Sequence, residues 1–172
     1  MKTNKQTGFT LMELMITTMI VGVLAMVVVP GMGEFVKNER LTTQINSLLS
    51  HLQYARSEAL LRHKQVVVCA SSNGATCAGS DWKLGWITFF DEDADGAVSG
   101  TDVLLKARDK LDGNNSLGSS MGASVVYDHR GFAPNSSGTF SLCDSRGATY
   151  GKSLTISATG RARVSGGATT CP

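Results

Sequence analysis

The sequence predicts an α+β protein in which a long N-terminal helix packs on a mostly antiparallel β-sheet domain. Two observations lead to this class. An apolar run near the N-terminus continues into a second helical pattern, and the chain after residue 63 changes to short β-branched and aromatic runs separated by Gly, Asn, Asp and Ser. The composition is globular, with 42% hydrophobic residues and a formal net charge of +2. Overall charge therefore predicts no nucleic-acid partner, and any such binding has to come from a local patch.

The first element is the apolar run Phe9–Val29, in which Glu13 is the single charged residue. A helix of this length measures roughly 30 Å, which matches the hydrocarbon core of a bilayer. Lys2 and Lys5 precede it, so the excess of positive charge on that side predicts a cytoplasmic N-terminus and an external remainder. We therefore predict a membrane-inserted helix over residues 9–30.

Three simpler explanations fit this run less well. A buried core helix is usually shorter than this run. A secretory signal peptide needs a small-x-small cleavage site after the run, and Val27-Val28-Val29-Pro30 is a poor one. A plain membrane anchor does not explain Glu13, because a carboxylate deep in lipid costs about 3 kcal/mol. Pro30 predicts either a kink or local melting of the helix, or simply the end of the membrane segment.

Residues 31–63 are predicted to continue as an amphipathic helix. Apolar residues recur there at spacings of three and four, which marks one face for packing on the rest of the domain. His51 and His63 are predicted on the solvated side of this helix. The apolar face consists of Leu41, Ile45, Leu48, Leu52, Ala55 and Ala59.

Residues 64–172 are predicted to form a β-rich soluble domain with six strands. The stretch Asp112–Gly122 is predicted to be a flexible loop, because it is rich in Gly, Asn and Ser. The predicted strands are Gln65–Ala70, Gly85–Phe90, Val103–Ala107, Ala123–Tyr127, Gly138–Cys143 and Ser153–Ala158.

Four cysteines lie in this region, and none belongs to a C-x-x-C pair. This pattern fits two disulfides in an oxidising compartment better than a zinc site. Four cysteines allow three connectivities. Proximity in the sequence favours Cys69–Cys77, and Cys143–Cys171 would then tie the C-terminal tail to a strand.

An acidic segment separates the second and third predicted strands. Asp91, Asp93, Asp95 and Gly96 fit positions one, three, five and six of an EF-hand-type loop, and Asp102 fits position twelve. Oxygen ligands at alternating positions suit a hard cation, so the four aspartates are a candidate calcium site. Position twelve is Asp instead of Glu and the flanks are predicted strands, so a solvated acidic hairpin loop is the alternative.

Two arginines in Gly160-Arg161-Ala162-Arg163 form the second candidate site. Alternate residues of an extended chain point the same way, so Arg161 and Arg163 would share a face and contact neighbouring phosphates. Lys152 and Arg146 lie nearby in the sequence and would extend the patch. DNA binding by so few cations would be modest and salt-sensitive. The alternative is that both arginines only decorate an exposed strand.

The catalytic motifs considered are absent from the sequence, and we expect no enzyme. Gly147–Ser153 is one residue short of the phosphate-binding loop G-x-x-x-x-G-K-S. Neither H-E-x-x-H nor G-x-S-x-G occurs.

The segment Gly8-Phe9-Thr10-Leu11-Met12-Glu13 resembles the prepilin leader motif of type IV pilins and type II secretion pseudopilins. The resemblance implies that prepilin peptidase removes residues 1–8 and that Phe9 becomes the N-methylated first residue. Glu13 matches the glutamate thought to meet the N-terminal amine of a neighbouring subunit. Such a charge pair can compensate a buried carboxylate and fix register, while the helix becomes part of a filament core.

Four further segments resemble the branch of H-type pseudopilins and FimU/FimT-like minor pilins: Leu52–Ala59, Val66–Cys69, Gly85–Asp91 and Gly160–Arg163. The resemblance implies a minor pilin that primes pilus assembly. It would begin in the bacterial inner membrane with its domain in the periplasm, and end at the pilus tip on the cell surface. The implied partners are other major and minor pilins, prepilin peptidase and the inner-membrane assembly platform.

FimT-like members of this branch carry a GRxR motif implicated in DNA capture during natural transformation. Gly160, Arg161 and Arg163 match it. The resemblance therefore adds DNA as an expected partner. An H-type pseudopilin acting in protein export by a type II secretion system is the alternative function.

Overall fold

The computed structural model describes residues 8–172, apart from the side chains of residues 27–31. It divides into two compact units, one ending at Lys37 and the other spanning Asn38–Pro172. Helix α1 (Leu11–Arg62) begins in the first unit and ends in the second. All buried apolar side chains of the described residues lie in Asn38–Pro172. This unit therefore has its own core and is expected to fold alone.

Helix α1 starts at a local sequence signal. The hydroxyl of Thr10 accepts a hydrogen bond from the backbone N–H of Glu13 at 3.2 Å. A threonine three residues before a glutamate is the pattern of a capping box, which satisfies N–H groups that the first helical turn leaves free. The helix therefore begins two residues after Phe9, directly behind the predicted leader.

The predicted membrane segment, residues 9–30, runs into positions whose side chains lie outside the described residues. Among the residues that the structure describes, no helix combines the length and the apolar character needed to cross a bilayer. The helix is continuous through Pro30. The predicted leader is described only at Gly8, and Lys2 and Lys5 lie outside the described part of the chain.

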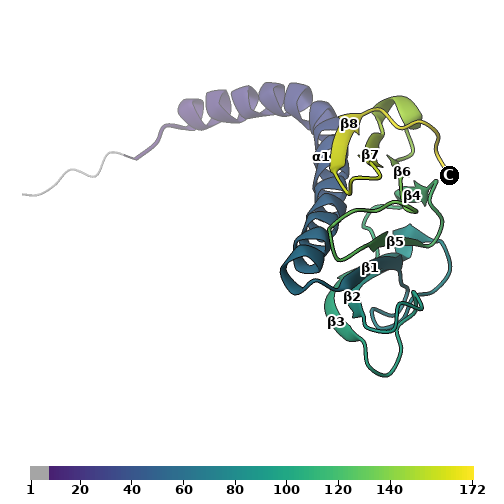
Figure 1. Cartoon of the computed structure of the whole chain (residues 1–172). Helices are drawn as coiled ribbons and strands as arrows, with labels where there is room; N and C mark the ends of the chain where they lie inside the picture. The colour runs from purple at the N-terminus through teal and green to yellow at the C-terminus, as the bar shows by residue number, and fades with distance from the viewer. Residues whose placement is uncertain (1–7) are drawn as a thin grey trace, which may run out of the picture. The chain divides into compact units, whose positions relative to one another are not determined.

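The second unit holds two four-stranded sheets, which Figure 1 shows beside the C-terminal part of α1. Neighbouring strands are antiparallel in both, with the orders β3-β2-β1-β5 and β4-β6-β7-β8. This arrangement confirms the predicted fold class. The strands of the first sheet are β1 (Gln65–Ala70), β2 (Gly85–Asp91), β3 (Val103–Asp109) and β5 (Ser124–Tyr127). Those of the second are β4 (Ser116–Ser119), β6 (Gly138–Cys143), β7 (Lys152–Ile156) and β8 (Ala162–Gly166), and two short 3₁₀ helices are η1 (Trp82–Leu84) and η2 (Ala148–Tyr150).

One apolar cluster joins the helix to both sheets. The predicted face of α1, from Leu41 to Ala59, is buried throughout. Trp86 and Tyr127 reach it from the first sheet, and Phe140 and Leu154 from the second. Burying one such side chain stabilises the fold by about 1.5–3 kcal/mol. The helix therefore serves as the common support of the two sheets.

The prediction of a flexible loop over Asp112–Gly122 is partly wrong, because β4 lies inside this segment and pairs with β6. A residue outside the segment also holds its C-terminal end: the indole N–H of Trp82 donates to the carbonyl oxygen of Gly122 at 2.9 Å.

Both disulfides have the pairing that the sequence favours. Cys69–Cys77 closes a short loop after β1, with the Cα atoms 5.6 Å apart. Cys143–Cys171 ties the C-terminal tail to the end of β6, with the Cα atoms 5.7 Å apart. The described residues contain no free cysteine.

Candidate functional site

The segment Gly160–Arg163 spans the turn and the start of the second strand of the β7–β8 hairpin. The backbone N–H of Ser157 donates to the carbonyl oxygen of Arg161 at 3.0 Å, and that of Gly160 to Ser157 at 2.8 Å. Gly160 has φ +76°, where a side chain is disfavoured. A Cβ atom here would also collide with the carbonyl oxygen of Gly131. Gly160 is therefore needed for the backbone conformation and the close packing of the turn.

Arg56 of α1 fastens this turn to the helix. Its Nε donates to the carbonyl oxygen of Gly131 at 3.0 Å, and its Nη2 donates to that of Thr159 at 3.2 Å. The turn after β5 and the turn of the hairpin thus share one guanidinium. Because Arg56 joins α1 to both turns, the backbone that leads into Arg161 and Arg163 is held in place.

Arg161 and Arg163 are both exposed. Strand alternation places Arg163 on the outward face of the second sheet, and Arg161 lies directly before β8. Arg163 lies opposite Thr155 of β7, itself exposed. Within the described residues, neither arginine belongs to an ion pair. Lys152 does not join them, because it is half-buried and lies opposite Leu142 on the inner side of the sheet.

Arg146 is also separate from this pair. Its Nη2 lies 2.7 Å from Oδ2 of Asp144, and the two side chains are only 10% and 6% exposed. The guanidinium also donates to Oδ1 of Asn38 at 2.9 Å and lies 4.8 Å from the ring centroid of Tyr150. These contacts hold the guanidinium of Arg146 within the fold. Of the four residues predicted to form the DNA-binding patch, Arg161 and Arg163 are therefore the two that remain candidates.

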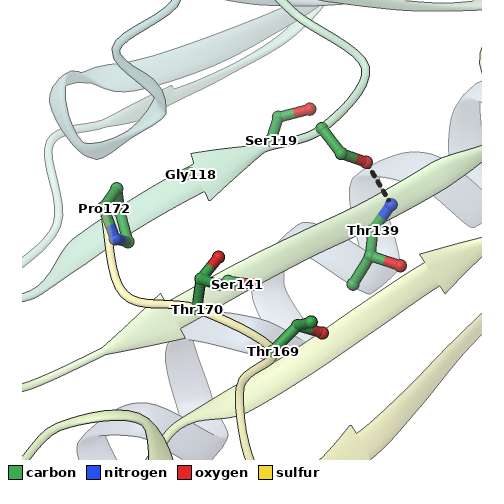
Figure 2. Close-up of a pocket in the computed structure, with 8 residues that line it drawn as sticks. Gly118, Ser119, Thr139, Ser141, Thr169, Thr170 and Pro172 are labelled. Carbon is green, nitrogen blue, oxygen red and sulfur yellow. Dashed lines mark hydrogen bonds between the residues drawn. The ribbon is translucent and has the colours of Figure 1, made fainter.

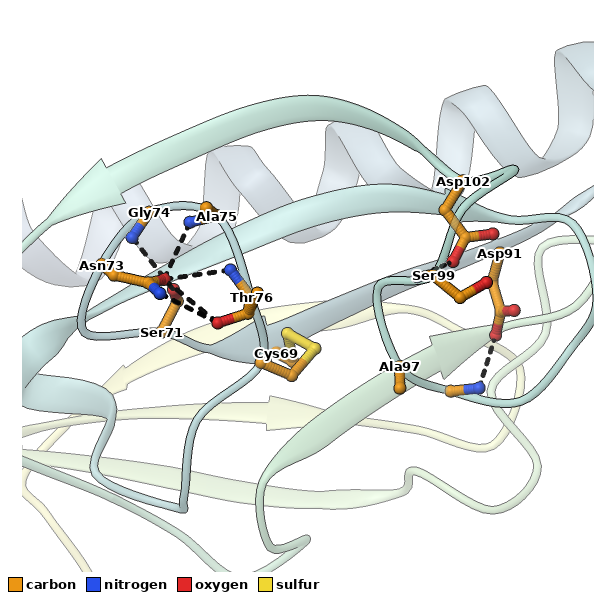
Figure 3. Close-up of a disulfide and its surroundings, with 12 residues drawn as sticks. Cys69, Ser71, Asn73, Gly74, Ala75, Thr76, Asp91, Ala97, Ser99 and Asp102 are labelled. Carbon is orange, nitrogen blue, oxygen red and sulfur yellow. Dashed lines mark hydrogen bonds between the residues drawn. A yellow bond between two sulfur atoms is a disulfide. The ribbon is translucent and has the colours of Figure 1, made fainter.

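The loop between β2 and β3 gathers the four predicted calcium ligands, of which Figure 3 labels Asp91 and Asp102. One carboxylate oxygen from each of Asp91, Asp93, Asp95 and Asp102 lies within 4.8 Å of the others. Burial alone would raise the pKa of Asp102, but hydrogen bonds from the backbone of its loop outweigh it and lower the pKa below the ordinary value. Asp102 therefore presents an ionised carboxylate, and the four aspartates together offer oxygen ligands of the kind that calcium prefers.

The structure also places the residues considered for catalysis. The segment Gly147–Ser153 forms η2 and the beginning of β7, so it is not the strand–loop–helix of a phosphate-binding loop. His51 was predicted on the solvated side of the helix, and this is wrong. It is 3% exposed, and its ring centroid lies 5.8 Å from that of Trp86.

Several known proteins resemble this chain. Residues 44–160 match the family model of type II transport protein GspH, and residues 3–29 match the prokaryotic N-terminal methylation motif. Two fimbrial proteins of Pseudomonas aeruginosa are each 35% identical over 66 residues, which is 38% of this chain and 42% of theirs. The match thus spans less than half the length of those relatives.

Two crystal structures of the type IV minor pilin FimU of Pseudomonas aeruginosa strain PAO1 share the fold. One superposes with a TM-score of 0.64 at 23% identity, covering 80% of this chain and 99% of that chain. The other gives a TM-score of 0.58 at 22% identity, covering 78% and 99%. At this level of identity the likeness concerns the fold.

Proposed function

Because the chain belongs to the GspH family of type IV pilin-like proteins, we propose that it is a minor pilin that primes pilus assembly and sits near the pilus tip. Members of this family are structural subunits, which work by packing with other pilins. The N-terminal methylation motif over residues 3–29 supports processing by prepilin peptidase. Cleavage would fall between Gly8 and Phe9, and Phe9 is 86% exposed ahead of α1.

The proposed route of the subunit follows from the same motif. Before assembly, the N-terminal part of α1 would hold it in the bacterial inner membrane, with Asn38–Pro172 in the periplasm. The assembly platform would then transfer it into the filament, where Glu13 would meet the N-terminal amine of a neighbouring pilin. Glu13 is exposed within its own unit, so a partner subunit can reach its carboxylate.

We further propose that the domain binds DNA through Arg161 and Arg163 in support of natural transformation. One observation carries this proposal: two exposed guanidiniums lie two residues apart on an edge hairpin, without an acidic partner in the described part of the chain. An unpaired guanidinium can donate two parallel hydrogen bonds to a phosphate. Two such contacts predict weak binding that depends on salt.

The test is a titration of Asn38–Pro172 with duplex DNA over a range of salt concentrations. We expect the logarithm of the binding constant to fall with the logarithm of salt at a slope of about −1.8, for two phosphates. Arg161→Ala plus Arg163→Ala should remove both the binding and the slope. The matched control is Arg62→Ala plus Arg130→Ala, which removes the same charge from side chains 60% and 65% exposed elsewhere. If the control loses binding equally, the two motif arginines have no special role.

The family match also favours a second function, that of an H-type pseudopilin in protein export. Deletion of the gene separates the two. Loss of surface pili with normal export would support the minor pilin, whereas retained pili with a secretion defect would support the pseudopilin. Genes beside it provide an independent test, because pilus operons and secretion operons differ.

A further inference from the structure

The outward face of the second sheet is covered with hydroxyl groups. Side chains alternate along a strand, so the positions opposite the core can be read from the register of β4, β6, β7 and β8. In these four strands the outward positions carry no acidic and no aromatic side chain. They are Ser116, Gly118, Thr139, Ser141, the disulfide residue Cys143, Ser153, Thr155, Arg163 and Ser165.

One row of this face is aligned with the motif. Arg163 lies opposite Thr155, and Thr155 lies opposite Thr139. The hydroxyls of Thr139 and Thr155 are 3.2 Å apart. Beyond them, the hydroxyl of Ser120 accepts a hydrogen bond from the backbone N–H of Thr139 at 2.9 Å. We call Thr155, Thr139 and Ser120 the hydroxyl row. With Arg163 it crosses the sheet over roughly 14 Å, since neighbouring strands lie about 4.8 Å apart.

The hydroxyl row ends in an open cavity of about 430 Å³ (Figure 2). Most of the residues that line it carry hydroxyl groups and come from the sheet, the adjoining turn and the tail: Ser119, Ser120, Thr139, Ser141, Thr169 and Thr170. Gly118 and Pro172 complete the lining. The disulfide Cys143–Cys171 holds the tail in place, and the ring of Pro172 sits against Gly118 so closely that a side chain there would meet it. The tail thus forms a fixed wall of the cavity.

We infer that the hydroxyl row is a phosphate track, along which one DNA backbone passes from Arg163 across the sheet into this cavity. The inference rests on the proposed DNA binding and extends it to neutral residues. Ser and Thr hydroxyls donate to phosphate oxygens. A track of roughly 14 Å is long enough to contact more than one phosphate of the same strand. No carboxylate on the outward positions repels them.

The same face determines what part of the nucleic acid is contacted. Proteins that bind single strands usually stack bases on aromatic side chains. The outward positions of β4, β6, β7 and β8 offer none, so contacts go to the sugar–phosphate backbone. We therefore expect duplexes of unlike base composition to bind with equal affinity.

Salt dependence separates the hydroxyl row from the arginines. A guanidinium that neutralises a phosphate releases counterions and steepens the salt dependence. A hydroxyl is neutral, so its hydrogen bond to phosphate adds affinity without changing the slope. The two kinds of residue thus leave different signatures in one titration.

The experiment compares Thr139→Val plus Thr155→Val with the unmodified domain Asn38–Pro172. Valine keeps the shape and the strand preference of threonine, and the double change removes both partners of the 3.2 Å contact together. We expect duplex DNA to bind ~3- to 10-fold more weakly, with the salt slope unchanged. The matched control, Ser50→Ala plus Ser57→Ala, removes two exposed hydroxyls from α1 and should bind normally. Equal melting temperatures would show that all variants are folded.

The outcomes distinguish the two claims. If the valine variant binds as well as the unmodified domain while Arg161→Ala plus Arg163→Ala abolishes binding, the track is wrong and the proposed DNA binding stands. If neither double variant changes the binding, both are wrong. If the valine variant flattens the salt slope, the hydroxyls do not act as neutral donors, and the track is again wrong.

Discussion

His51 is held neutral in the folded domain at pH values where the unfolded chain would already take up a proton. Burial is the main cause, and the charges of Lys106 and Arg108 add to it, which together lower its pKa from 6.5 to about 4. Its Nδ1 lies 3.5 Å from the hydroxyl of Thr88. The residue therefore links the helix to the first sheet, and its burial there favours the neutral form.

We predict that acid weakens the fold through His51. The unfolded chain binds the proton below about pH 6.5 and the folded domain only below about pH 4. The free energy of unfolding should therefore fall across this window, by up to about 1.4 kcal/mol per pH unit, and His51 should cause no further loss below it. Urea denaturation at several pH values measures this dependence.

The variant His51→Gln should flatten the pH dependence of stability in that window. His129→Gln is the matched control, because His129 is exposed and its loss should leave the dependence unchanged. An equal slope in the two variants would contradict the assignment to His51.

Single residues also show what the sequence can and cannot predict. Alternation along an extended chain predicts that Arg161 and Arg163 share a face, and both side chains are exposed in the structure. The helical period of α1 marks its buried face, but it does not reveal that Trp86 and Thr88 of β2 lie against His51. Arg146 was wrongly assigned to the basic patch, because its burial depends partly on a contact with Asn38 that joins residues 108 apart in sequence.

At the scale of elements, the β7–β8 hairpin depends on its turn. Gly160→Ala should destabilise the domain by about 2 kcal/mol or more, because the left-handed backbone and a collision with Gly131 add together. Gly167→Ala is the control, since Gly167 has the same φ of +76° but open space around it. Thermal unfolding should show the smaller loss for Gly167→Ala, by the cost of the backbone alone. Equal losses would mean that the contact with Gly131 is easily relieved.

The acidic loop between β2 and β3 gives a second prediction at this scale. We expect millimolar calcium to raise the melting temperature of Asn38–Pro172 and a chelator to reverse the rise, since binding to the folded state alone stabilises it. Asp93→Asn plus Asp95→Asn should abolish the effect, while magnesium should replace calcium poorly. A melting temperature indifferent to calcium would leave the loop as a solvated acidic turn.

The elements themselves were predicted unevenly. The six strands expected from β-branched and aromatic runs all occur, with ends shifted by a few residues. β4 and β8 were not among the six predicted strands. Ser-Leu-Gly-Ser carries no β-branched or aromatic residue and β8 carries only Val164, so their strand form comes from pairing with β6 and β7. Two separate sheets also could not be foreseen, since strand order depends on contacts distant in the sequence.

At the scale of the whole molecule, the residues that stabilise the fold and the residue proposed to act in assembly lie on opposite sides of the division after Lys37. Glu13 lies outside the unit that holds the core. We therefore predict that Glu13→Gln leaves the melting transition of the domain unchanged but prevents incorporation into pili. Immunoblots of sheared filaments and of cell membranes measure the two pools. Normal amounts of the variant in filaments would contradict the proposed charge pair with a neighbouring subunit.

The outward face of the second sheet has a consequence for how such subunits diverge. Its hydroxyl residues point away from the apolar cluster, and none of them belongs to it. Substitutions on this face would change which ligand the domain binds more readily than they would change its free energy of unfolding. A lineage could therefore exchange one binding preference for another through a handful of mutations, while the helix and the two sheets beneath stayed the same.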